Sequence, residues 1–380
     1  MATAGAGGAA PTAGAAGDTS TTAGTAGAVG TAGSGGSTTG GAGGSTNEPM
    51  QPDPRGIYGH PDPTFEYPKY DGFTPYLIEE FNQPLDLEHD LNWTYGDGAL
   101  FEGQTRMVKE NISFENGSMV LKITNQMQPG AYSFSAADNV AEKPLSSGEL
   151  RTIYNNFRYG RYEVRMKAPS NGSNYIFTMF AYRTPAYLLW REIDIEVQAS
   201  PQNTFITNLI TAAPGTRKWS PAIEDSTVMY PYGQGQGSPI PAGYNSQSDY
   251  HVYAFEWLPG SIKWFIDGTL IRTKLDGQGK NGLPIPKEST KIVMNLWVFT
   301  SKDLGGGDPA LNTFPIAGQY DWFRFYKWNE DATYPCKGAP GCLSAADLEL
   351  AKNNKTDPLP DKRPDLCTGK EGMRDAPCGI

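Results

Sequence analysis

Three acidic residues, Glu192, Asp194 and Glu196, are spaced two residues apart within the stretch Trp190–Val197. If this stretch is a β-strand, alternate side chains share a face, so the three carboxylates lie on one face. The opposite face is apolar and consists of Ile193, Ile195 and Val197. Like charges on one face repel each other, and acidic residues are depleted in strands. The pattern therefore indicates a functional site rather than a stabilising one.

Paired carboxyl groups about 5–5.5 Å apart can hydrolyse a glycosidic bond with retention of configuration. One attacks the anomeric carbon, and the other protonates the leaving oxygen and then deprotonates water. Glu192 and Glu196 are roughly 13 Å apart along an extended backbone, so their side chains must lean together on a curved, twisted sheet. Asp194 can hydrogen-bond to either one and keep their protonation states different. A solvated, non-catalytic strand face is the alternative interpretation.

The segment Glu192–Glu196 matches the E-x-D-x-E signature of family 16 glycoside hydrolases, in the uninterrupted form found in lichenases and xyloglucan endotransglycosylases. The flanking segments resemble those of bacterial lichenases (1,3-1,4-β-glucanases), and the resemblance extends from about Tyr76 to Trp328. The matching segments are Gly148–Arg151, Tyr159–Lys167, Tyr250–Trp257, Ile262–Gly268, Met294–Trp297 and Tyr320–Trp322. Each segment alone is weak, but together and in this order they are a strong match.

The resemblance implies a role for each acidic residue of the strand. Glu192 corresponds to the nucleophile, Glu196 to the acid/base and Asp194 to the residue that tunes them. Glu196 needs a raised pKa for this role, which nearby carboxylates favour. Arg191 stands where lichenases usually have an acidic residue, but it is out of phase with Glu192, so we expect it to point away from the catalytic face.

The same resemblance implies a set of substrate-binding side chains. These are Glu149, Arg151, Trp190, Asn208, Asn295 and Trp297. Alternative interpretations are a surface ion pair for Glu149 and Arg151, and core packing for Trp190. Ile210 replaces a tyrosine that the family usually has, which would alter one subsite.

A structural calcium site is a further implication of the resemblance. Asp321 matches a carboxylate that holds Ca²⁺ in many relatives together with backbone carbonyls, one of them near Gly117, and hard oxygen ligands suit this ion. A surface aspartate without a metal is the alternative. His251 also matches a family position, and we expect it to be structural. The expected mechanism uses carboxylates and no cofactor for catalysis.

Short strand-like segments separated by turns dominate the region that must position these residues. Examples are Ser118–Ile123, Arg161–Met166, Ile176–Phe180, Thr204–Leu209 and Ile262–Ile266. Asn116-Gly117 and Asp267-Gly268 are typical centres of hairpin turns. Because helical periodicity is nearly absent, we predict an all-β protein with a β-sandwich. The resemblance implies a jelly roll of two curved antiparallel sheets with a concave substrate cleft.

Composition divides the chain into four parts. Residues 1–48 are rich in Gly, Ala, Thr and Ser, which predicts a disordered linker. Residues 49–75 are rich in Pro and Tyr and are expected to lie extended against the domain without elements of their own. Residues 76–330 form the expected catalytic domain. Residues 331–380 form a cysteine-containing appendage with a helix predicted over Leu343–Lys352.

Charge and cysteine content limit partners and location. A net charge of −10 without a basic block argues against nucleic acid and anionic membranes. The chain contains no run of about 18 apolar residues, so no membrane-spanning helix is predicted. No signal segment is visible at the start. The cysteines, whose C-x5-C and C-x10-C spacings do not fit the usual zinc pattern, favour disulfides with three possible pairings. They are Cys336, Cys342, Cys367 and Cys378.

We therefore expect a secreted or cell-surface-tethered monomer that hydrolyses mixed-linkage 1,3-1,4-β-glucan by double displacement. The closest alternative has the same chemistry on xyloglucan, laminarin or an algal galactan, as a hydrolase or a transglycosylase. A non-catalytic carbohydrate-binding protein is a second alternative, because jelly rolls often bind sugars without cleaving them. The linker alone suggests a third, a structural cell-surface protein.

Overall fold

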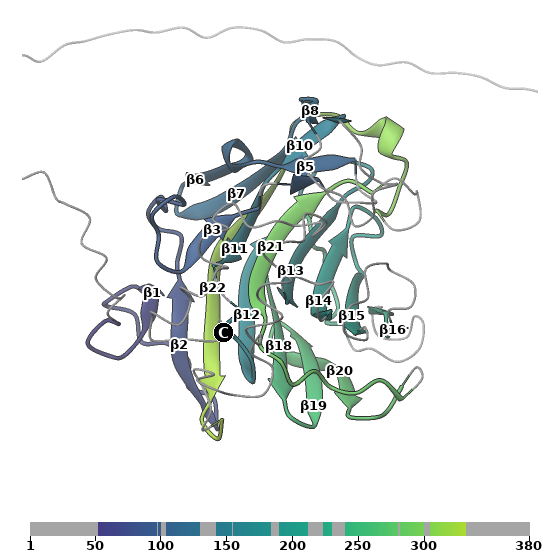
Figure 1. Cartoon of the computed structure of the whole chain (residues 1–380). Helices are drawn as coiled ribbons and strands as arrows, with labels where there is room; N and C mark the ends of the chain where they lie inside the picture. The colour runs from purple at the N-terminus through teal and green to yellow at the C-terminus, as the bar shows by residue number, and fades with distance from the viewer. Residues whose placement is uncertain are drawn as a thin grey trace, which may run out of the picture. The chain divides into compact units, whose positions relative to one another are not determined.

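The computed structural model describes residues 52–96, 98–99, 104–129, 142–153, 155–183, 190–211, 223–229, 240–279, 282–299 and 305–331. Strands make up nearly all the regular structure of these residues (Figure 1), and the named helical elements are the short 3-10 turns η1 (Lys109–Asn111) and η4 (Pro309–Leu311). The all-β prediction is confirmed. The predicted linker, the predicted helix over Leu343–Lys352 and the four cysteines lie outside the described residues.

The first large sheet contains nine strands within the described part of the chain. Its main path runs in the order β1 (Tyr58–His60), β2 (Phe73–Glu79), β22 (Ile316–Trp328), β12 (Gly160–Lys167), β18 (His251–Leu258), β19 (Ser261–Ile266) and β20 (Thr269–Leu275). Off this path, β7 (Ser118–Ile123) pairs with β22 and with β6 (Ile112–Glu115). All pairings are antiparallel except that of β1 with β2.

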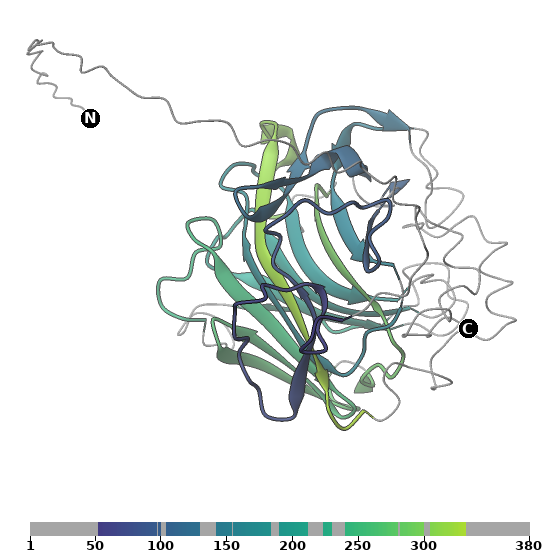
Figure 2. The same cartoon turned by 90° about the vertical axis from the view of Figure 1, so that its left-hand side faces the viewer.

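The second large sheet has eight strands in the described ranges and carries the predicted site. Its order is β16 (Ile223–Glu224), β15 (Phe205–Thr211), β14 (Arg191–Gln198), β13 (Ile176–Tyr182), β21 (Lys291–Trp297), β11 (Glu149–Thr152) and β3 (Trp93–Tyr95), and β17 (Thr227–Met229) also pairs with β15. Both sheets are visibly curved (Figure 2). Two small sheets join β10 (Leu145–Ser147), β5 (Thr105–Met107) and β4 (Gly98–Ala99), and β8 (Gln128–Pro129) with β9 (Glu142–Lys143).

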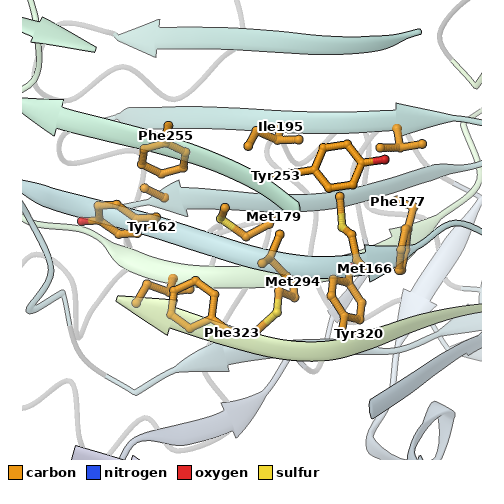
Figure 3. Packing of buried hydrophobic residues seen from close by; sticks show 14 of the residues in the cluster. Tyr162, Met166, Phe177, Met179, Ile195, Tyr253, Phe255, Met294, Tyr320 and Phe323 are labelled. Carbon is orange, nitrogen blue, oxygen red and sulfur yellow. The ribbon is translucent and has the colours of Figure 1, made fainter. Parts of the chain in front are cut away.

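The hydrophobic core lies between the two large sheets. Figure 3 shows Tyr162 and Phe255 of the first sheet packed with Met179, Ile195 and Met294 of the second. Each of these side chains is fully buried, and such burial stabilises the fold by about 1.5–3 kcal/mol per large apolar side chain. One face of the second sheet therefore packs in the core. Because side chains alternate along a strand, the remaining side chains of this sheet lie on its opposite face.

Both predicted hairpin turns are present. Asn116 (φ 53°) and Gly117 (φ 75°) connect β6 to β7, and Asp267 (φ 47°) and Gly268 (φ 78°) connect β19 to β20. Positive φ at both central residues gives a turn whose twist matches that of the flanking strands. Asn, Asp and Gly tolerate this backbone region best.

The Pro- and Tyr-rich lead-in lies against the domain as expected, but it does form an element. Residues Tyr58–His60 make strand β1, which pairs in parallel with β2. Ile57 and Tyr67 bury their side chains against Ile78 of β2. The prediction that this segment forms no element was wrong, because the edge of β2 offers unpaired backbone groups that an extended neighbour can satisfy. No helix within the described residues has the length and apolar character needed to cross a membrane.

Candidate active site

The predicted catalytic strand is β14, and its two faces separate as the alternation requires. Ile193, Ile195 and Val197 are buried in the core at 0%, 0% and 1% exposure. Glu192, Asp194 and Glu196 therefore lie on the face opposite the core, which we call the carboxylate face. Glu192 and Glu196 are partly exposed, whereas Asp194 is buried.

Register places a different pair of neighbours beside each acidic residue of β14. Glu196 lies between Thr178 and Ile206, Asp194 lies between Phe180 and Asn208, and Glu192 lies between Tyr182 and Ile210. Directly opposite side chains on one sheet face approach to about 4.5–5.5 Å between Cβ atoms. The predicted residue Asn208 thus meets the middle carboxylate. Ile210, the departure from the family pattern, faces Glu192.

A row of polar side chains extends from Glu196 across the sheet. Thr178, Asn295 and Glu149 follow one another on β13, β21 and β11. Thr178 Oγ1 donates to Asn295 Oδ1 at 2.7 Å, and Asn295 Nδ2 donates to Glu149 Oε2 at 3.0 Å. Arg151 lies on the same face, with Nε 3.8 Å from Glu149 Oε1. Both members of this ion pair are fully buried, so it is not an ordinary surface pair.

Trp190 precedes β14 and contacts Glu192 directly. Its indole Nε1 donates to Glu192 Oε2 at 2.6 Å. The indole is only 4% exposed. Residues that are two positions apart on an extended chain point to the same face. Alternation therefore places Trp190 on the same face as Glu192. A hydrogen bond from an N–H group favours the ionised carboxylate, which is the form that a nucleophile needs.

Two aromatic side chains of the core support the backbone beneath the carboxylate face. Trp264 Nε1 donates to the carbonyl of Asp194 at 3.1 Å. The Tyr320 hydroxyl donates to the carbonyls of Thr178 at 2.7 Å and Asn295 at 3.2 Å. Burial raises the pKa of the Tyr320 hydroxyl well above its usual range, so it stays a neutral donor. The site therefore rests on both sheets, because Trp264 and Tyr320 belong to the first one.

Several residues of the carboxylate face were not predicted from the sequence. Register adds Thr178, Phe180 and Tyr182 from β13, and the buried Lys291 from β21 opposite Tyr182. The segment Ile176–Tyr182 is apolar on both faces except at Thr178, so its sequence shows no alternation that would identify the face. The single polar residue within an otherwise apolar strand was the available signal.

Arg191 and His251 behave as expected. Arg191 Nε donates to Glu288 Oε2 at 2.8 Å, away from the carboxylate face. Although burial opposes it, this contact keeps the pKa of the Glu288 carboxyl below its usual value. His251 bonds Asp267 through Nδ1 at 2.7 Å and the Asn245 carbonyl through Nε2 at 3.2 Å. Both ring nitrogens are engaged in structural contacts.

Asp321, the predicted calcium ligand, pairs with a cationic side chain. The guanidinium Nη1 of Arg165 lies 2.5 Å from its Oδ2 atom. Pairing of Tyr320 with Met119 does bring the Gly117 turn near this strand segment. A cation beside the carboxylate opposes a second cation, however, so this ion pair counts against Ca²⁺ at Asp321. Within the described residues no group of three or more His, Cys, Asp or Glu side chains could hold a metal.

Comparison with known proteins agrees with this arrangement. The family described as glycosyl hydrolases family 16 matches residues 102–322. The β-glucanase of Paenibacillus polymyxa is 29% identical over 253 residues, which cover 64% of this chain and 87% of the relative. The β-glucanase of Bacillus amyloliquefaciens is 32% identical over 254 residues, covering 65% and 87%.

The fold is likewise shared with a solved structure. The laminarinase catalytic domain from Thermotoga maritima superposes with a TM-score of 0.50 at 17% identity, covering 68% of this chain and 99% of that one. At this identity the match concerns the fold, which is the expected jelly roll. The family match extends over more than half of the chain and includes strand β14 with its three carboxylates. The chain belongs to glycosyl hydrolases family 16 and is a glycoside hydrolase.

Proposed function

We propose that this enzyme is a secreted, monomeric endo-β-glucanase that hydrolyses mixed-linkage 1,3-1,4-β-glucan with retention of configuration. One observation carries the proposal: Glu192, Asp194 and Glu196 share the face of β14 that is turned away from the core. Two of these carboxylates are partly exposed and can reach a substrate. The two sequence relatives compared above are both named β-glucanases, which favours a β-glucan substrate.

Glu192 acts as the nucleophile in this proposal. The Trp190 indole N–H at 2.6 Å stabilises its ionised form and fixes its orientation. Attack by Glu192 on the anomeric carbon breaks the glycosidic bond and forms a covalent glycosyl-enzyme with inverted configuration. Water then displaces Glu192 from the opposite side, so the released sugar has its original configuration.

Glu196 acts as the acid/base. It gives its proton to the leaving oxygen in the first step and takes a proton from water in the second. Ile206 beside it provides an apolar neighbour, and Thr178 on the other side connects it to the polar row. Asp194 lies between the two catalytic groups, with its backbone held by Trp264, and keeps their protonation states different.

The extent of the carboxylate face favours action within a chain rather than at its end. The polar row crosses β14, β13, β21 and β11, and adjacent strands lie about 4.8 Å apart. Hydrogen-bonding groups are therefore distributed over about 14 Å to one side of Glu196. Glu192, Glu196 and Trp297 of this face are partly exposed and can contact sugar rings, whereas Asn295, Glu149 and Arg151 are buried and hold the strands beneath the substrate in position.

Extracellular action agrees with a polysaccharide substrate and with a cysteine pattern that favours disulfides. Calcium is not part of the proposal, because Arg165 already pairs with Asp321. Transglycosylation is the closest alternative outcome, since a sugar hydroxyl can replace water in the second step.

A substrate panel tests the proposed function. Purified enzyme is incubated with barley mixed-linkage glucan, cellulose, laminarin, xyloglucan, agarose and carrageenan, while reducing ends and viscosity are followed together. We expect fast hydrolysis of the mixed-linkage glucan, with viscosity falling early, and proton NMR showing the β-anomer first. Glu192→Gln is the control for contaminating activity. Preference for another polymer would change the substrate, and no release from any polymer would favour the carbohydrate-binding alternative.

A further inference from the structure

The chain continues the carboxylate face beyond Asn295 with two aromatic side chains, one at the end of β21 and one just after it. Asn295, Trp297 and Phe299 alternate along the chain and so share a face. Trp297 and Phe299 are both partly exposed, whereas Leu296 and Val298 between them are buried at 0% exposure. By rise per residue, Trp297 lies about 7 Å and Phe299 about 13 Å from Asn295 along the strand direction.

The two rings form a corner rather than one continuous surface. Their centroids are 5.4 Å apart, and their planes meet at 77°. A ligand that contacts both rings must therefore present two flat apolar faces that are also strongly inclined to each other.

Backbone contacts hold Phe299 in place although it lies beyond the end of β21. Its N–H donates to Asn174 Oδ1 at 3.2 Å, and its carbonyl accepts from Gln104 Nε2 at 3.5 Å. The Gln104 N–H also donates to the carbonyl of Val298, the residue before Phe299, at 2.9 Å. The corner is thus fixed before any ligand binds, which reduces the entropy lost on binding.

Asn174 is itself immobilised by the segment that follows the corner. It is fully buried, and its Nδ2 donates to the Gly307 carbonyl at 2.8 Å. Asn312 Nδ2 donates to the Asn174 carbonyl at 3.0 Å. A Cβ atom on Gly305 would collide with the Asn174 side-chain amide. The glycines of this segment therefore permit the close packing that positions Phe299.

We propose that Trp297 and Phe299 bind two consecutive sugar rings at a bend in the chain, and that Phe299 is a specificity-determining residue for 1,3-1,4-β-glucan. The inference rests on the proposed function and deepens it. Successive rings of a 1,4-linked β-glucan form a nearly flat ribbon, which cannot stack on two planes 77° apart. A 1,3-linkage turns the chain, so the ring before it can lie on one aromatic face and the ring after it on the other.

Binding of two non-hydrolysable, S-linked tetrasaccharides tests this without requiring cleavage. One is entirely 1,4-linked, and the other has one 1,3-linkage between 1,4-linked units. Calorimetry should show the wild type binding the bent ligand about 3- to 10-fold more tightly than the straight one. Phe299→Leu keeps an apolar side chain but removes the flat ring, so the ratio should fall below about 2. The matched control, Phe299→Tyr, retains the ring and should retain the ratio.

Three results would overturn the inference: equal affinity of the wild type for both ligands, an unchanged ratio in Phe299→Leu, or a ratio lost equally in Phe299→Tyr. Melting curves check that each variant is folded, and Phe299→Met, also apolar and without a ring, provides a second reading if leucine destabilises the protein. Failure of the proposed function has a separate signature, because it requires that the wild type release no reducing sugar from mixed-linkage glucan.

Discussion

The indole Nε1 of Trp264 donates a hydrogen bond to the backbone carbonyl of Asp194 at 3.1 Å. Trp264 belongs to β19 of the first sheet and Asp194 to β14 of the second. The bond crosses the core and is buried along its whole length. It therefore couples the packing of one sheet to the position of the carboxylates on the far face of the other.

Trp264→Phe should lower both stability and activity. Leaving the buried Asp194 carbonyl without this donor costs about 1–3 kcal/mol, and a small shift of the strand should lower kcat by about 10- to 100-fold. Trp257→Phe is the matched control, because Trp257 is also fully buried but donates to the Pro286 carbonyl at 3.0 Å, away from β14. Urea denaturation and kinetics of both variants check this. An equal loss of kcat in the control would remove the specific role of Trp264.

Azide should rescue the two catalytic variants with opposite stereochemistry. Glu192→Ala lacks the nucleophile, so azide attacks the substrate directly and gives an inverted α-glycosyl azide. Glu196→Ala still forms the glycosyl-enzyme, so azide gives a retained β-product. Glu196→Ala should lose about 10²- to 10⁴-fold on polysaccharide but much less on an aryl glycoside with a good leaving group. NMR of the products decides the matter, and the reverse pairing of variant and anomer would exchange the two roles.

The lead-in should detach more easily as the pH rises above neutrality. His60 Nδ1 lies 2.8 Å from Oε2 of the fully buried Glu79. The hydrogen bond to Glu79 raises the pKa of His60 to about 9, although burial opposes this. Because the pKa is raised in the folded state, the stabilisation is fully present below the unfolded value of about 6.5 and is lost as the pH rises through about 9.

Urea denaturation from pH 6 to pH 10 measures this effect. The stability difference between the wild type and His60→Asn should shrink as the pH passes about 9. His89→Asn is the control, because the side chain of His89 is 78% exposed and pairs only with nearby Asp86 in the structure described. If the stability of both variants relative to the wild type depends on pH in the same way, the contact between His60 and Glu79 does not stabilise the lead-in.

Calcium should not change the melting temperature. A ligand that binds only the native state raises it, but Arg165 and Asp321 already form an ion pair in which each side chain is about one-third exposed. Melting curves in excess Ca²⁺ and in chelator should coincide for the wild type. Arg165→Gln frees the carboxylate and is the informative comparison. A rise of several degrees with Ca²⁺ in the wild type would restore the calcium site implied by the family resemblance.

Strand β14 and much of the fold could be predicted from the sequence because their signals are local. Alternation from Glu192 to Val197 assigns each residue to a face without any knowledge of its neighbours. The turns at Asn116-Gly117 and Asp267-Gly268 depend on backbone preferences of the residues themselves. The positions of Glu149, Asn208 and Asn295 near this strand followed from the family resemblance, and their register confirms that they share its face.

Only the tertiary structure could decide which residues contact each other between the two sheets or between neighbouring strands. Strand Ile176–Tyr182 is apolar on both sides, so the placement of Phe180 and Tyr182 beside the carboxylates depends on strand pairing. The contact of Trp264 with Asp194 joins residues 70 positions apart. Asp321 matched a calcium ligand in sequence, yet its partner is Arg165 on an adjacent strand. Such partners are set by register and packing, which no local pattern of residues encodes.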